Sequence, residues 1–393
     1  MKKLSVISIS IVLFFCGCNE KQIKNLTGAH TSIEIDNPVS LSIEDFVIDI
    51  DTIRLETSDE SIITSILNMH IMNNRFYILT NNFSSVYIFD FNGKFISKIS
   101  DRGDGPNEYI RITSFEVDKI NRNIIISDNF SRRIFIYDQD GSQIETIPLD
   151  FQPIVILPHP NGFLNIYSGP RDIYNIPEME NYNVHFLNSR GKFISSAIEV
   201  TTPKRIDIGS AFMADCLANG DILFQPVLSE IIYKIEGENI IPLYSFSNLS
   251  RFKFLTLKEK MNFQYVFAKE NSLEEKEEQG YLLTWGGVRD LDSSVFFSFS
   301  GWKKRYYLYY SKSLNKALLI DPEEMRGNKA LTDIYLNYPK AVDGNKFYIS
   351  PDPGLIDIVK NKLPEGIIKM FFEKTDFDSN PILISFSIKF PGE

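Results

Sequence analysis

Short apolar runs separated by turns of Asn, Gly and Asp recur along most of the chain. The clearest example lies within residues 112–149, where runs rich in Ile, Val, Phe and Tyr occupy about 112–118, 123–127, 132–137 and 142–149. β-branched and aromatic residues favour strands, and Asn and Gly tolerate the positive φ angles of tight hairpin turns. The pattern therefore predicts four consecutive antiparallel strands in this segment.

The same arrangement repeats along the chain. The segment "FYILTNNFSSVYIFDFNGKFISKI" (76–99) returns as "IIISDNFSRRIFIYDQDGSQIETI" (124–147), and weaker copies lie at 184–198, 230–244 and 305–320. Self-similarity at a period of roughly 50 residues is typical of folds built from repeated units. A unit of four antiparallel strands is the blade of a β-propeller.

The number of blades follows from the length of the patterned region. Residues 255–279 and 354–374 carry apolar positions at helical spacing, so we expect helical insertions there. The rest accommodates six units, of which the last ends on "PILISFSIKF" (381–390), one strand short. The run "DFVIDIDTIRLE" (45–56) has no unit of its own and is expected to supply the missing outer strand. The prediction is an all-β, six-bladed propeller of four-stranded antiparallel blades, closed by an N-terminal strand.

The first residues have the pattern of an export leader. Lys2 and Lys3 precede an apolar run, Leu4–Phe15, that is too short to span a bilayer as a stable helix, and the small Gly17 precedes Cys18. This order resembles a bacterial lipoprotein signal, which implies cleavage before the cysteine and lipidation of its thiol. A plain secretory signal or an N-terminal anchor are the alternatives.

Three segments are therefore expected. Residues 1–17 are predicted to be a lipoprotein signal peptide, residues 18–43 a lipidated tether, and residues 44–393 the propeller. The first dozen residues after Cys18 are polar and weakly patterned, which is typical of a flexible tether.

The net charge and the positions of the cysteines limit the kinds of partner and site that we expect. A net charge of −10 argues against nucleic acid as a partner, because nucleic acid requires a clustered basic face. Of the three cysteines, Cys16 would leave with the signal and Cys18 would carry lipid, so Cys216 stands alone and no disulfide is expected. Cys216 lies in an apolar run and is expected to pack in the core rather than act as a nucleophile. No metal-binding motif occurs, and we expect neither a metal site nor a cofactor.

Four stretches carry a resemblance to a known family: "TIRLETSDESII" (52–63), "VYIFDFNGKFISKISDRGDGPNEY" (86–109), "IFIYDQDG" (134–141) and "SNPILISFSIKF" (379–390). In them the chain resembles the six-bladed β-propeller lipoproteins of Bacteroidetes, relatives of NHL and TolB-like propellers. The resemblance covers nearly the whole mature chain and implies a fold and a location at the cell envelope. It implies no agreed activity.

The two faces of such a propeller differ in their connections. Turns after the first and third strands of each blade form one face, here called the turn face, and are short and rich in Asn and Gly. Links after the second and fourth strands form the opposite face, the loop face, and are longer and more varied. Long irregular loops often carry function, so any site is expected on the loop face.

The stretch "SDRGDGPNEY" (100–109) is the link from the first blade to the second. A phosphate cradle is disfavoured because no helix start follows, and a calcium loop because the alternating acidic ligands are missing. The favoured interpretation is a structural linker, with glycines at strained backbone positions and Glu108 and Tyr109 pinning the loop.

Basic and aromatic residues on the loop-face links are the candidates for ligand binding. Arginine binds carboxylates in bidentate fashion and aromatic rings stack on sugars or cations, although solvated loop charge is the plainer explanation. His70 lies in an innermost-strand run and could face the central channel, where a structural role is favoured. The predicted ligand-binding residues are Arg102, Arg132, Arg133, Arg171, Arg205 and Trp302.

The predicted function is recognition at the cell envelope, through a propeller that binds a glycan or peptide and is anchored by lipid in the outer membrane. The alternative is a propeller enzyme, such as a lactonase-like hydrolase or a lyase, with its site in the central pocket. A scaffold that binds an envelope protein partner is a third hypothesis. The sequence alone does not decide between a binding protein and an enzyme.

Overall fold

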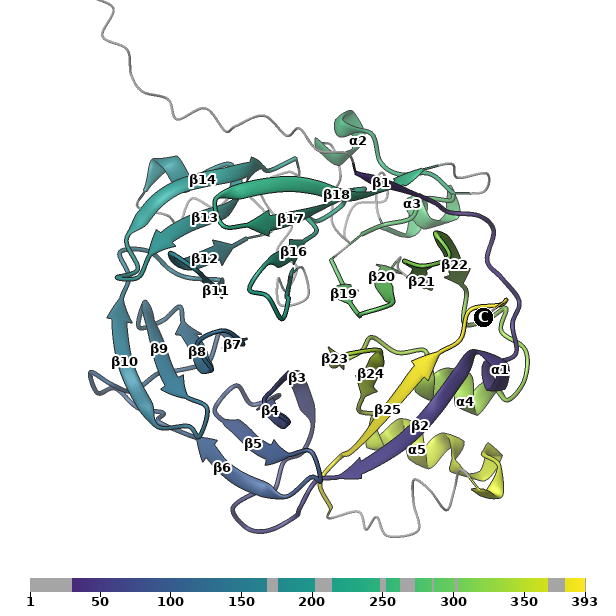
Figure 1. Ribbon diagram of the computed structural model, residues 1–393, viewed down its shortest axis with the longest axis horizontal. Helices are drawn as coiled ribbons and strands as arrows, with labels where there is room; N and C mark the ends of the chain where they lie inside the picture. Colours follow the sequence, from purple (N-terminus) through teal and green to yellow (C-terminus); the bar gives the residue numbers. More distant parts are fainter. Residues whose placement is uncertain are drawn as a thin grey trace, which may run out of the picture.

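The computed structural model describes residues 30–167, 176–201, 214–247, 252–261, 273–284, 286–300, 303–366 and 379–392. In these ranges the chain forms six β-sheets arranged as a ring around a central axis (Figure 1). The six-bladed propeller predicted from the repeat is confirmed. Arg171, Arg205 and Trp302 lie outside the described residues, as do the leader and Cys18.

The first three blades follow the chain order from the inside of the ring to its rim. Their strands are β3 (Ile66–Met72), β4 (Arg75–Thr80), β5 (Val86–Asp90) and β6 (Phe95–Ile99); β7 (Ser114–Asp118), β8 (Asn123–Asp128), β9 (Arg133–Asp138) and β10 (Gln143–Pro148); and β11 (Val155–His159), β12 (Gly162–Ile166), β13 (Tyr182–Asn188) and β14 (Phe193–Glu199).

Blades four to six continue the ring, with one extra strand on blade four and a borrowed strand on blade six. Their strands are β15 (Ala214–Cys216), β16 (Ile222–Phe224), β17 (Ile231–Glu236), β18 (Asn239–Ser247) and the added β1 (Thr31–Glu34); β19 (Val288–Asp290), β20 (Ser294–Ser300), β21 (Arg305–Ser311) and β22 (Lys316–Ile320); and β23 (Ala341–Asp343), β24 (Lys346–Ile349), β25 (Ile382–Ile388) and β2 (Val47–Arg54).

The ring closes between the two ends of the chain. Strand β2 pairs antiparallel with β25, with Thr52 opposite Ile384 and Arg54 opposite Ile382. The N-terminal segment therefore supplies the outer strand of the blade whose other strands come from the C-terminal segment, as the sequence predicted. Without β2, the edge of β25 would present unpaired N–H and C=O groups.

Part of the segment expected to be a tether is folded onto the propeller. Strand β1 pairs in parallel with β18 of blade four, with Thr31 opposite Tyr244. The chain then runs along blade five, where the N–H of Val39 donates to the carbonyl of Leu319 (2.9 Å). It reaches blade six through the short helix α1 (Ile43–Phe46) (Figure 1). We call residues 31–46 the N-terminal strap.

The core consists of apolar layers between neighbouring blades. Aromatic residues of blade five fill the layer against blade six: the ring of Phe347 lies 6.0 Å from that of Phe296 and 5.7 Å from that of Tyr309, both edge to face. This geometry is favourable for aromatic pairs. The dense aromatic content of blade five thus serves packing between blades.

Helices occur where the insertions were predicted and also at other places. Both predicted insertions contain short helices, and another follows blade five. The described helices are α2 (Leu257–Met261) and α3 (Leu273–Glu278); α5 (Pro353–Val359) with the 3-10 turn η3 (Lys360–Lys362); α4 (Lys329–Tyr335); and, elsewhere, α1 and the 3-10 turn η1 (Pro177–Met179). Within the described ranges no helix is both long and apolar enough to cross a membrane.

Candidate functional site

The link between blades one and two is held by its own side chains. The carboxylate of Glu108 accepts a hydrogen bond from the N–H of Gly105 (2.9 Å), and the N–H of Gly103 donates to the carbonyl of Tyr109 (3.0 Å). The hydroxyl of the fully buried Tyr109 donates to the carbonyl of Ser84 (2.7 Å). Neither Gly103 nor Gly105 has a positive φ, so the expectation of a strained backbone at these glycines is wrong; a Cβ at Gly103 would instead collide with the Glu108 carboxylate. These contacts support the interpretation of "SDRGDGPNEY" as a structural linker.

The predicted ligand residues that the structure describes belong to this same region of the loop face. Nε of Arg102 donates to the carbonyl of Ile110 (3.2 Å), and Nη1 of Arg133 donates to the carbonyl of Gly105 (3.0 Å). Arg132 is exposed and adopts a positive φ of 54° in the loop between β8 and β9. Arg102 and Arg133 therefore brace the linker, and a role in ligand binding stays a prediction for all six residues.

The innermost strands of five blades bring charged side chains to the centre of the ring. They line a cavity of about 20 Å³, which is room for about one water molecule. Met69 and Val342 are among the apolar residues of the lining. Its acidic, basic and histidine residues are His70, Glu116, Lys119, Asp215, Arg289 and Lys340.

The half-buried His70 and the buried Glu116 form a pair that is uncharged near neutral pH. Burial lowers the pKa of His70 to about 3 and raises the pKa of Glu116 to about 8. Nε2 of His70 donates to the carbonyl of Phe115 (3.1 Å), which leaves Nδ1 as an acceptor 3.6 Å from Oε2 of Glu116. The expectation that His70 faces the channel is met, and its bond to Phe115 gives it a structural role.

Cys216 lies beside this pair and packs as predicted. Its side chain contacts the apolar layer between blades three and four and also lines the channel. Burial raises the pKa of its thiol well above the usual range, with the acids Glu116 and Asp215 adding to the shift. A thiol held in its protonated form is a poor nucleophile.

From the sequence, we predicted only that His70 could face the channel, and none of the charged residues of this cavity. The sequence nevertheless contains a signal for three of these residues, because each is a charged residue within an apolar inner strand. Glu116 lies in "SFEVD", Asp215 in "ADC" and Arg289 in "VRD". A charge inside a buried strand is costly unless it is paired or functional. Only the ring geometry shows that these isolated charges meet.

A second and larger cavity opens on the loop face between blade five and the helices that follow it. Its volume is about 380 Å³, within the range of small-ligand pockets. Tyr307, Leu336 and Leu355 give it an apolar part. Its charged lining consists of Lys303, Lys304, Arg305, Asp321, Glu323, Lys329 and Asp333. We call it the blade-five cleft.

Helix α4 forms one wall of the cleft. The side chain of Asn328 caps the helix by accepting from the N–H groups of Ala330 (2.9 Å) and Leu331 (3.3 Å). The apolar face of α4 is buried, while Lys329 and Asp333, spaced four residues apart, lie on the cleft side with Nζ and Oδ1 3.6 Å apart. This helix was not predicted from the sequence, although the Asn cap followed by apolar residues at helical spacing was a usable signal.

The opposite wall depends on the insertion that contains α2 and α3. The carboxylate of Glu277 in α3 accepts the N–H groups of Lys303 (2.8 Å) and Lys304 (2.5 Å). This places both lysines at the mouth of the cleft.

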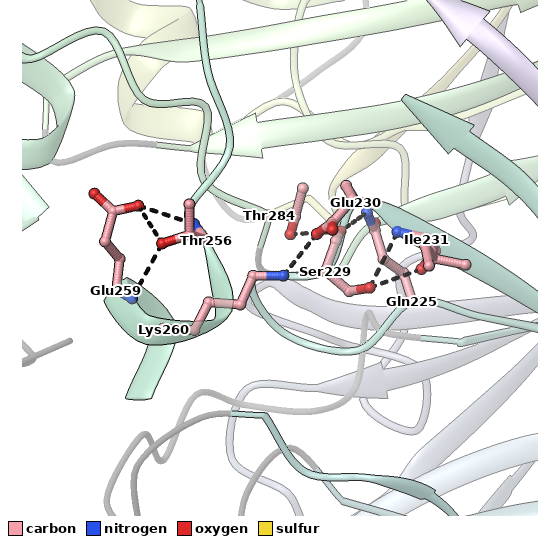
Figure 2. Close-up of polar contacts among 8 residues, drawn as sticks. All are labelled: Gln225, Ser229, Glu230, Ile231, Thr256, Glu259, Lys260 and Thr284. Carbon is pink, nitrogen blue, oxygen red and sulfur yellow. Dashed lines mark hydrogen bonds and ion pairs between the residues drawn. The ribbon is translucent and has the colours of Figure 1, made fainter. Parts of the chain in front are cut away.

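The insertion is itself fastened to blade four by charged groups. Nζ of the buried Lys260 in α2 donates to Oε2 of Glu230 (2.6 Å), beside the bonds of Thr284 and Gln225 to the carbonyl of Ser229 (Figure 2). The hydroxyl of Thr256 caps α2 by accepting from the N–H of Glu259, and the Glu259 carboxylate accepts from the N–H of Thr256, as Figure 2 shows. The same carboxylate also accepts from the Tyr281 hydroxyl. The Tyr281 bond, with those from Thr256, lowers the pKa of Glu259 to about 2.

The acids and histidines of the described ranges do not form a group of three that could hold a metal ion.

Comparison with known proteins shows which family the chain belongs to. A family model described as a domain of unknown function (DUF4934) matches residues 28–387. The chain belongs to the DUF4934 family. The match begins before β1 and ends within β25, so it covers the whole ring, including the N-terminal strap.

Two solved structures share the fold of this DUF4934 chain. One is a protein of Bacteroides fragilis that is inferred to be exported, with 17% identity, a TM-score of 0.69, and coverage of 92% of this chain and 100% of that one. The other is a member of the DUF4221 family from Bacteroides vulgatus, with 12% identity, a TM-score of 0.52, and coverage of 88% and 97%. No curated protein matches the chain. At these identities the likeness shows the fold alone.

Proposed function

We propose that this protein is a recognition propeller of the cell envelope that binds a glycan in the blade-five cleft. The observation that carries the proposal is the contrast between the two cavities. The channel holds about 20 Å³ at its centre, whereas the cleft holds about 380 Å³ and lies on the loop face, where the sequence predicted ligand binding.

The lining of the cleft fits hydroxyl-rich ligands. Carboxylates such as those of Asp321 and Asp333 accept hydrogen bonds from sugar hydroxyls, and the cations of Lys304 and Arg305 donate to sugar oxygens. The half-buried Leu355 adds an apolar surface for the C–H face of a sugar. The lining has one more cation than the acids Asp321, Glu323 and Asp333 provide, which favours a glycan that carries a carboxylate, such as a uronic acid.

Binding should therefore depend on the cleft residues and not on the turn face. In equilibrium binding to a panel of neutral and uronic-acid-bearing envelope and plant oligosaccharides, Arg305→Ala and Asp333→Asn are each expected to weaken binding by more than about 1 kcal/mol, or roughly fivefold, as for buried contacts. Asn92→Ala and Asn161→Ala, in tight turns of the opposite face, serve as matched controls and should bind as the parent does.

The loop-face arginines near blades one and two are the competing candidate for the ligand site. If Arg132→Ala weakens binding while Arg305→Ala and Asp333→Asn do not, the ligand occupies the region first predicted from the sequence and the cleft proposal is wrong. Loss of binding in the Asn92 or Asn161 variants would contradict the assignment of the site to the loop face.

The alternative of an enzyme acting in the central pocket gains no support from the described channel residues. A reacting sugar or lactone needs more space than a cavity for about one water. The same oligosaccharide panel separates the two functions, because an enzyme would release new products during the incubation while a binding protein would return the ligand unchanged.

The envelope location rests on the leader, with Cys18 as the lipidated residue. Acyl chains contribute about 0.8 kcal/mol for each buried methylene, so several chains attached to Cys18 would hold the protein firmly at the outer membrane. We expect Cys18→Ala to abolish incorporation of labelled fatty acid and to release the propeller from the membrane fraction. Cys216→Ala is the control and should keep its label. Unchanged labelling of the Cys18 variant would contradict lipidation there.

A further inference from the structure

We propose that the central channel binds one monatomic anion of the chloride class, held by Arg289 at the junction of blades two, four, five and six. This inference is independent of the glycan proposal, because the channel cavity and the blade-five cleft share no lining residue.

Arg289 is the observation that calls for an anion. Its side chain is only 5% exposed, yet within the described ranges no carboxylate oxygen lies within 4.0 Å of its guanidinium. Nη1 donates to the carbonyl of Val288 (3.0 Å), and the guanidinium lies over the ring of Tyr338 at 5.0 Å. Buried charges in proteins are normally paired, because removing a cation from water without a counter-charge costs several kcal/mol.

The cavity beside Arg289 has the size of a single ion. About 20 Å³ accommodates one water or one monatomic ion, whereas a carboxylate, phosphate or sulfate group is too large for it. Two further cations line it from other blades. Lys119 of blade two donates to the carbonyl of Cys216 (3.0 Å), and Lys340 precedes the inner strand of blade six.

The acids around the cavity leave this positive charge uncompensated near neutral pH. The lining holds two carboxyl groups, Glu116 and Asp215, and Asp215 accepts a hydrogen bond from the N–H of Asp290 (2.9 Å). Glu116, with its pKa raised to about 8, is mostly protonated at neutral pH. Burial lowers the pKa of Lys340, but Arg289 and Lys119 alone outnumber Asp215.

The neighbouring groups outside the lining do not change this balance. Asp290 is paired with Lys312 (2.9 Å), and Asp343 is exposed to solvent and is not part of the cavity lining. His70, with a pKa of about 3, is neutral, and the Cys216 thiol is protonated. An anion in the cavity therefore meets a net positive field.

Glu116 makes the site sensitive to alkaline pH. As the pH rises through about 8, Glu116 loses its proton and places a negative charge against the same cavity. Arg289 and Lys119 then face an ionised carboxylate, and the bound anion is repelled. Anion binding is expected to be strong near neutral pH and to be lost as Glu116 ionises.

The test is thermal unfolding of the full mature chain in chloride and in gluconate at equal ionic strength, together with chlorine NMR line broadening. Chloride is expected to raise the midpoint by a few degrees at pH 7, with saturation, because a ligand that binds only the folded state stabilises it. The effect should vanish at pH 9.5 in the parent chain but persist there in Glu116→Gln. Arg289→Gln should lose both the midpoint shift and the line broadening.

Two controls keep the test decisive. Arg305→Gln removes an exposed arginine from the blade-five cleft and should retain the full chloride effect. Arg289→Lys keeps a buried cation and should retain broadening even if its midpoint falls, which covers the case in which Arg289→Gln does not fold. Equal midpoints in chloride and gluconate with no broadening in the parent, or broadening that survives in a folded Arg289→Gln, would overturn the site.

Discussion

Removal of residues 19–54 is expected to destroy the cooperative fold of the propeller. This deletion takes away the N-terminal strap and strand β2 together. The truncated chain should aggregate or unfold without a sharp transition in circular dichroism and calorimetry, whereas the mature chain should melt cooperatively.

The size of the effect follows from what the segment buries. Ile33, Ile35, Ile43, Phe46 and Val47 are each 4% exposed or less. Full burial of such a side chain contributes roughly 1.5–3 kcal/mol, so the five together contribute on the order of 10 kcal/mol. Typical domains are stable by only about 5–15 kcal/mol in total. The deletion also exposes the edge of β25, which favours association between chains.

Two shorter deletions separate the contributions. A chain lacking residues 19–29 keeps the strap and β2 and should melt as the mature protein does. A chain lacking residues 19–37 loses β1 but keeps ring closure by β2, and should fold with a lowered midpoint. If the chain lacking residues 19–54 stays monomeric with an unchanged midpoint, closure by the N-terminal strand does not stabilise the ring.

Asn380→Ala is expected to be the most damaging single substitution at the point where the ring closes. Asn380 is 4% exposed and joins the start of β25 to the chain that follows β2. Nδ2 donates to the carbonyls of Glu56 (2.7 Å) and Ser61 (2.9 Å), and Oδ1 accepts from the N–H of Ile63 (2.7 Å). Its own N–H donates to the Thr57 hydroxyl (2.9 Å).

Alanine would leave the N–H of Ile63 and the carbonyl of Ser61 without these partners, while the carbonyl of Glu56 keeps the bond from the Ser61 hydroxyl (2.7 Å). Each unsatisfied group costs about 1–3 kcal/mol, so we expect a loss of at least about 2 kcal/mol in the free energy of unfolding, measured by urea denaturation. Asn380→Asp keeps the acceptor for Ile63 but loses both donations, and should be destabilised as well. Asn92→Ala, in an exposed turn, is the control and should stay close to the parent. A change below about 1 kcal/mol for Asn380→Ala would show that water or a backbone shift replaces the three bonds.

The turns show why so much of the fold could be predicted. In "DFNG" and "DQDG", the aspartate accepts backbone N–H groups two and four residues later, as Asp90 does from Asn92 (2.8 Å) and Lys94 (2.9 Å). The glycine then adopts a positive φ, 80° at Gly93, where a Cβ would also collide with the carbonyl of Arg54. Such local requirements are written in neighbouring residues, so they mark the hairpins and, through their spacing, the blades.

The N-terminal strap could not be predicted in the same way. Strand β1 is four residues long, and its partners in β18 lie more than 200 positions away. The run "TSIE" has little pattern of its own, and only the exposed edge of blade four gives its backbone groups partners. Helix α4 is a different case, because its cap and apolar face were present but were counted as part of a long link.

The same distinction, between signals in neighbouring residues and contacts between distant segments, applies to the candidate sites. By itself, the sequence determined the repeat, the number of blades, the closing strand and the face with the long links, because turn chemistry and strand alternation act over a few residues. Only the tertiary structure decided that Arg289, Glu116 and Asp215, from three blades, share one cavity, and that α4 faces β21 across a cleft. The reason is that a ring brings together the same strand of every blade, so residues far apart in the chain become neighbours at its axis.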